Sequence, residues 1–170
     1  MQSVNALYHV KILRRLLLLL VITTLCSSPV FADATAFIGT GTTPSNRQTR
    51  GFAAGFGLFV FGFEFEYSNM VETETPAPAL QTLMGNVLVQ TPGAFLIPGI
   101  QFYVTMGAGG YTETLGARQV KNIGFNSGGG VKVSLAGPIR VRLDYRIFRL
   151  RGDALYPISH RLYGGLNLSF

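Results

Sequence analysis

Residues 138–147 read PIRVRLDYRI, and two kinds of side chain alternate along them. The odd positions from Ile139 to Ile147 are apolar or aromatic, and the even positions from Arg140 to Arg146 are charged. This alternation predicts a β-strand, because successive side chains of a strand point to opposite faces of the sheet. In a soluble sandwich the apolar face would form the core. In a transmembrane barrel it would face lipid, and the charged face would line the lumen.

Similar alternation recurs along residues 33–170, and no stretch there keeps a helical period. At residues 61–68, which read FGFEFEYS, aromatic side chains alternate with glycine, glutamate and serine. Short alternating runs separated by glycine-containing turns indicate an all-β chain. We predict eight strands, at about residues 35–41, 51–58, 60–68, 82–90, 100–111, 125–135, 138–149 and 161–170.

The connections between these predicted strands alternate in length. The long ones cover residues 42–50, 69–81, 112–124 and 151–160, and the short ones cover residues 59, 91–99 and 136–137. Long connections at one end and short ones at the other are typical of outer-membrane barrels, and strands of roughly 8 to 11 residues suit a tilted bilayer crossing. We therefore predict an eight-stranded antiparallel up-and-down transmembrane β-barrel. A soluble periplasmic barrel or sandwich is the alternative.

Residues 1–32 have the composition of a cleaved secretory signal peptide. Lys11, Arg14 and Arg15 precede an apolar segment, and Ala32 offers a small residue before the predicted cleavage point. The apolar segment is about half as long as a membrane-spanning helix. Residues 33–170 then form the single barrel domain. They contain no cysteine, because Cys26 is the only one in the chain, which excludes disulfides and thiolate metal sites.

The charge balance does not favour nucleic acid as a partner. The chain has 14 basic and 8 acidic residues, for a net charge of +6. The first 32 residues hold three of the basic residues and no acidic one, which leaves eleven basic and eight acidic residues and a net charge of +3. We expect no metal and no cofactor either, because the sequence contains no motif for one.

The last strand ends on an aromatic residue, Phe170, with Leu162, Leu166 and Leu168 at alternate positions before it. This pattern resembles the C-terminal signal that hands bacterial barrel proteins to the outer-membrane assembly machinery. Residues 33–170 as a whole resemble the small eight-stranded barrels related to the transmembrane part of OmpA and to OmpX. The resemblance implies a location in the bacterial outer membrane. We expect a monomer in contact with lipopolysaccharide and without catalytic activity.

In such a barrel the charged side chains on the inward faces would meet in the lumen. Eight strands enclose a lumen that side chains just fill, and unpaired charges there are costly. We predict an ion-pair network that plugs the barrel, and the alternative is a narrow gated ion path. The predicted members are Glu64, Glu66, Lys132, Arg140, Arg142, Asp144 and Arg146.

Seven basic residues fall at or beyond the predicted outer strand ends, where they would meet glycolipid phosphates. They are Arg47, Arg50, Arg118, Lys121, Arg149, Arg151 and Arg161. The enzymatic alternative is lipid A modification by Ser159 and His160, but adjacent strand residues face opposite ways. We therefore expect a structural or surface-interaction role through the four outer loops.

Overall fold

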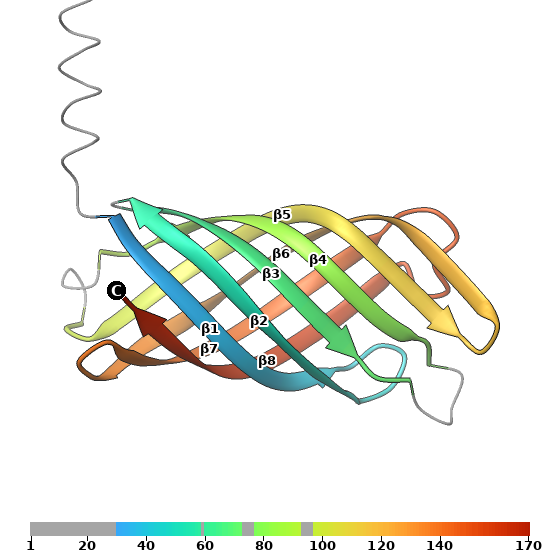
Figure 1. The fold of residues 1–170 in the computed structure, drawn as a ribbon, viewed down its shortest axis with the longest axis horizontal. Coiled ribbons are helices and arrows are strands. Elements are labelled where there is room, and N and C mark those ends of the chain that lie inside the picture. The colour runs from blue at the N-terminus through green and yellow to red at the C-terminus, as the bar shows by residue number, and fades with distance from the viewer. Residues whose placement is uncertain (1–29, 59, 73–76, 93–96) are drawn as a thin grey trace, which may run out of the picture.

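The computed structural model describes residues 30–58, 60–72, 77–92 and 97–170. Over these residues the chain forms one closed barrel in which each strand pairs with the next and β8 pairs antiparallel with β1 (Figure 1). The strands are β1 (Val30–Gly41), β2 (Arg47–Leu58), β3 (Phe61–Met70), β4 (Ala79–Gln90), β5 (Ile100–Leu115), β6 (Arg118–Ala136), β7 (Ile139–Leu150) and β8 (Ile158–Ser169). The prediction of an eight-stranded antiparallel barrel is confirmed.

The predicted signal peptide falls mostly outside the described residues, which begin at Val30. Residues 30–32, which we assigned to the end of that segment, form the first part of β1 and pair with β2. Among the residues that the structure describes, no helix is long and apolar enough to cross a bilayer.

Side chains alternate between the inside and the outside of the barrel along most of the strands. On β7, Leu143 and Tyr145 are exposed on the outer surface, whereas Arg142, Asp144 and Arg146 are fully buried inside. Large apolar residues also cover the outside of the remaining strands. They include Phe52, Phe56, Phe61, Phe63, Phe65, Leu83, Val87, Val89, Phe102, Val104, Met106, Leu162, Leu166 and Leu168. A continuous apolar outer surface on a closed barrel is the surface that lipid covers, so the outer membrane is the location that this molecule's surface indicates.

The two ends of the barrel differ. The start of β1, the end of β8, the ends of β2, β4 and β6 and the starts of β3, β5 and β7 lie at one end, which we call the inner end (Figure 1). The opposite, outer end carries the ends of β1, β3, β5 and β7 and the starts of β2, β4, β6 and β8. In outer-membrane barrels the end with the termini is periplasmic.

The prediction of an outer loop at residues 112–124 is wrong. These residues instead prolong β5 and β6 into a long hairpin that ends in the two-residue turn Gly116–Ala117, and Leu115 pairs with Arg118. Polar side chains occur on both faces of this part, because it projects beyond the apolar belt. The apolar–polar alternation that identifies a strand by sequence is therefore absent there.

Candidate functional site

The centre of the lumen holds five charged side chains from two facing strands. Glu64 and Glu66 of β3 lie opposite Arg142, Asp144 and Arg146 of β7. Arg146 contacts all three acids, at 2.8 Å to Glu64, 3.0 Å to Asp144 and 3.1 Å to Glu66. Arg142 pairs with Glu64 and lies 3.2 Å from Asp144. The predicted pairing of β3 acids with β7 arginines is thus present in the structure.

Arg161 of β8 extends this network toward the outer end. Its Nη2 lies 2.6 Å from Glu66, and its Nη1 donates a hydrogen bond of 2.8 Å to Ser68. The guanidinium also lies over the rings of Phe37 and Phe148, with 5.1 Å and 4.8 Å to their centroids. Cation–π contacts of this kind stabilise a desolvated guanidinium in addition to its ion pair.

Uncharged polar side chains supply further hydrogen bonds to the network. The Tyr103 hydroxyl donates to Asp144 and accepts a hydrogen bond of 2.7 Å from Arg142 Nε. Asn86 lies 3.4 Å from Glu64 and accepts a 2.8 Å hydrogen bond from Asn126. These groups supply donors and acceptors that water would otherwise provide, which lowers the cost of burying the charges.

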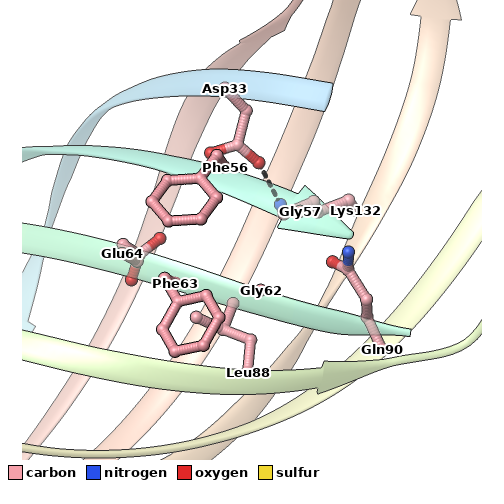
Figure 2. Close-up of a pocket in the computed structure, with 9 residues that line it drawn as sticks. All are labelled: Asp33, Phe56, Gly57, Gly62, Phe63, Glu64, Leu88, Gln90 and Lys132. Carbon is pink, nitrogen blue, oxygen red and sulfur yellow. Dashed lines mark hydrogen bonds and ion pairs between the residues drawn. The ribbon is translucent and has the colours of Figure 1, made fainter. Parts of the chain in front are cut away.

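A separate ion pair lies toward the inner end of the lumen. Lys132 of β6 pairs with Asp33 of β1, and Figure 2 shows the two side chains meeting near Gln90. The hollow beside this pair has a volume of about 10 Å³. A space of that size holds about one water molecule, so the inner end of the lumen offers no wide channel.

An apolar cluster lies in the outer part of the lumen. Six buried residues form one cluster there: Met70, Leu80, Met84, Tyr111, Phe148 and Leu150. The loop at residues 151–157 is tied to this end, since the Tyr111 hydroxyl donates to the Arg151 carbonyl and Leu155 N donates to Glu113 at 2.9 Å. An ion crossing the barrel would therefore meet an apolar layer after the ionic one.

The network is electrically balanced over the described residues. Its acids are Asp33, Glu64, Glu66 and Asp144, and its bases are Lys132, Arg142, Arg146 and Arg161. A balanced set leaves no excess charge inside the apolar belt, where an unpaired ion would be strongly unfavourable.

Three sequence-based assignments are wrong. Arg140 is only half-buried, and within the described part of the chain it forms no ion pair. Arg161 is an interior residue with 1% exposure, so it does not belong to the outer rim. Arg47 is likewise buried, and its guanidinium donates to the carbonyls of Pro78 and Thr43 and so joins two outer connections.

The missed members of the interior were Asp33, Tyr103 and Arg161. Arg161 occupies the same alternating set on β8 as Tyr163 and Asn167, which are buried. That alternation is a usable signal for Arg161, although the residue stands at the first position of the predicted strand. Asp33 had no such signal, because it fell at the first residue of the predicted domain.

The remaining predicted rim residues lie on the surface of the outer end. Arg50, Lys121 and Arg149 are exposed at outward-facing positions of β2, β6 and β7. Arg118 and Arg151 lie at the outer hairpin and loop, where Arg118 donates to the Asp153 carbonyl and Arg151 lies 5.2 Å from the Phe125 ring centroid.

Ser159 and His160 do not meet. Ser159 is buried inside the barrel, whereas His160 faces outward and its Nδ1 lies 2.7 Å from the Tyr145 hydroxyl. Over the residues described, no group of three or more His, Cys, Asp or Glu side chains has a geometry that could hold a metal ion.

A closed barrel with an apolar exterior and an ion-paired interior defines the class of small transmembrane β-barrels. No protein-family model matches the sequence, and no curated protein matches it. Solved structures match the fold.

Three of these structures cover most of the chain. Neisserial surface protein A has a TM-score of 0.65 at 14% identity, over 83% of this chain and 97% of that chain. The N-terminal β-barrel domain of OprF from Pseudomonas aeruginosa has a TM-score of 0.60 at 14% identity, over 82% and 97%. Ail, the attachment invasion locus protein of Yersinia pestis, in complex with the heparin analogue sucrose octasulfate, has a TM-score of 0.53 at 8% identity, over 83% and 98%. The chain thus has the fold of an eight-stranded bacterial outer-membrane barrel, as the resemblance implied.

Proposed function

We propose that this protein is a monomeric, non-conducting and non-catalytic outer-membrane barrel whose role is structural or is exercised through its outer loops and rim. The observation that carries this proposal is the filled lumen. The ionic network at its centre is followed by the apolar cluster at its outer end. Such an interior makes a rigid support for an outer surface rather than a path for solutes.

A narrow ion path is the second candidate, because ion pairs can exchange partners. Opening would require separation of Arg142 from Glu64 and displacement of the cluster around Met84 and Phe148. We expect the purified barrel to produce no discrete conductance steps in planar bilayers. Heat-denatured protein and protein-free detergent serve as controls. Steps that only the folded protein produces would overturn the closed-barrel proposal.

The non-catalytic proposal rests on the separation of Ser159 from His160 across the barrel wall. A serine nucleophile needs its base within hydrogen-bond reach. We expect purified protein to leave the acyl chains of lipid A intact by mass spectrometry. The non-catalytic proposal would be contradicted if lipid A lost an acyl chain only in the presence of the folded protein and kept it with the His160→Ala variant.

The basic residues exposed at the outer end favour a negatively charged partner. Arg50, Lys121, Arg149 and Arg151 are all exposed at that end. Phosphate groups of lipopolysaccharide lie at the corresponding depth of the outer leaflet, and exposed arginine and lysine attract them. The similarly folded Ail was solved with a sulfated heparin analogue, another polyanion. We therefore propose lipopolysaccharide as the surrounding partner.

We also propose that the barrel assembly machinery recognises the C-terminal strand during biogenesis. Leu162, Leu166, Leu168 and Phe170 all point outward and are exposed, which leaves them open to contact before lipid surrounds the strand. Phe170 N donates a 2.8 Å hydrogen bond to the Ala32 carbonyl, so the terminal residue also continues the seam between β8 and β1.

A further inference from the structure

Five outward-facing polar residues form one continuous row across β2 to β6. Strand register places Arg50 beside Asn69, Asn69 beside Gln81, Gln81 beside Thr112, and Thr112 beside Lys121. The next outward row toward the inner end is mostly apolar, and contains Phe52, Tyr67, Leu83, Gly110 and Ile123. The boundary between the two rows is where a membrane would change from headgroups to acyl chains.

Two hollows lie on this boundary, one on each side of Tyr67. One has a volume of about 420 Å³ and is lined by Ala36 and Phe52 among others. The other has a volume of about 350 Å³ and is lined by Leu83 and Gly110 among others. Tyr67 lines both, so its ring forms the ridge between them. The hollows exist because alanine and glycine stand in the row where neighbouring strands carry large side chains.

Each hollow has one cation at its polar edge. Arg50 lines the hollow on the β1–β3 side, and Lys121 lines the hollow on the β3–β6 side. No acidic residue lines either hollow, and neither cation has an ion-pair partner in the described part of the chain. These two charges therefore differ from those of the lumen network, in which each arginine and lysine is paired with an acid.

We propose that this outer face of β1 to β6 binds a phosphate-bearing glycolipid of the outer leaflet. Its acyl chains lie in the hollows on the two sides of Tyr67, and its phosphates lie against Arg50 and Lys121. Asn69, Gln81 and Thr112 offer hydrogen bonds to the sugar headgroup between the two cations. The site deepens the proposed function and rests on its membrane orientation, but it does not depend on whether the lumen conducts.

The test measures the fraction of purified barrel that retains a lipid in native mass spectrometry. The probes are bisphosphorylated lipid A, the same lipid without its phosphates, and phosphatidylglycerol. We expect lipid A retention to fall about tenfold for each of Arg50→Ala and Lys121→Ala, because each removes a charge-assisted contact to phosphate. Gly110→Leu should also reduce retention by filling its hollow. A Cβ at Gly110 meets no atom within 4 Å, so a side chain can begin there without a clash.

Two variants serve as matched controls and should retain lipid A as the unmodified protein does. Arg140→Gln removes a half-buried cation at the start of β7, at the inner end of the barrel and away from both hollows, and Gly85→Leu adds the same side chain lower on the outward face of β4. Folding of every variant is checked by heat-modifiable gel mobility.

Several results would overturn the proposal. The first is that all variants retain lipid A as well as the unmodified protein does. The second is that the unmodified protein retains the dephosphorylated lipid or phosphatidylglycerol as well as it retains lipid A. The third is a dimer that forms without lipid and that Arg50→Ala and Lys121→Ala abolish. The last result would assign this face to a second copy of the chain. Conductance recorded from the same samples tests the closed lumen separately, so that failure of one proposal is distinguishable from failure of the other.

Discussion

At the scale of single residues, the interior is a set of charges that are buried only because each one is paired. Glu64 accepts contacts from both Arg142 and Arg146, and Arg146 in turn contacts three acids. A buried ion pair adds little stability relative to apolar residues of the same shape, but removing one partner is strongly destabilising. The network is therefore sensitive to single substitutions.

Glu64→Gln should lower the free energy of unfolding by about 3–5 kcal/mol, because two buried guanidinium groups lose a counter-charge. The measurement is urea unfolding of the barrel in lipid vesicles, followed by circular dichroism and by gel mobility. The double variant Glu64→Gln, Arg142→Gln should lose less than the sum of the two single variants, because it restores the charge balance.

Arg140→Gln is the matched control for this prediction. Arg140 lies on β7 with Arg142 but is only half-buried, and it forms no ion pair with any residue that the structure describes, so its loss should change stability by about 0.5 kcal/mol or less. Equal losses for Glu64→Gln and Arg140→Gln would show that the ion pairs do not stabilise the fold.

At the scale of elements, the β5–β6 hairpin is the feature that the sequence pattern described least well. It projects at the outer end, and its two-residue turn holds Gly116 at a φ of +55°. That left-handed conformation is open to glycine at little energetic cost, whereas a residue with a Cβ is strained there. Arg118 and Glu113 connect the hairpin to the loop at residues 151–157.

Gly116→Ala should therefore destabilise the hairpin by about 1–2 kcal/mol, because alanine pays the left-handed penalty at this position. Hydrogen exchange of the amides at residues 112–115 and 118–121 should become faster, while the amides of the central barrel keep their protection. Gly110→Ala, on β5 of the same hairpin, has no positive φ and has open space for a Cβ, so it is the control and should leave exchange unchanged.

At the scale of the whole molecule, closure of the sheet allows an ion-paired interior and an apolar outer surface to coexist in one barrel. Because β8 pairs with β1, no strand edge is exposed, and every backbone group within the apolar belt can bond within the sheet. The last residues of the chain complete this seam, so barrel closure and the proposed assembly signal lie on the same strand.

Phe170→Ser should reduce the amount of folded protein in the outer-membrane fraction severalfold, because the exposed terminal aromatic is lost from the proposed assembly signal. The measurement is membrane fractionation combined with gel mobility before and after boiling. Ser169→Ala, a neighbouring substitution that leaves the aromatic intact, is the control. Unchanged outer-membrane levels of Phe170→Ser would contradict the assignment, and a detergent-free soluble monomer of the unmodified protein would contradict membrane insertion.

The amino-acid sequence by itself determined the class of fold and the two faces of most strands. Alternation with a period of two is a local property, so Leu143 and Arg142 could be assigned to opposite faces without knowledge of their neighbours. The same alternation would have placed Arg161 inside. It could not describe residues 112–124, which project past the apolar belt and lack an apolar face.

Only the tertiary structure decided which charges meet. Arg142 and Glu64 are 78 residues apart in sequence, and Lys132 and Asp33 are 99 residues apart. Their contacts depend on strand register, on tilt and on the closing of β8 against β1, none of which a single strand's sequence encodes. The tertiary structure likewise placed Arg50 and Lys121 beside hollows. A hollow forms where a small residue on one strand lies beside large side chains on neighbouring strands, and strand register decides which residues are neighbours.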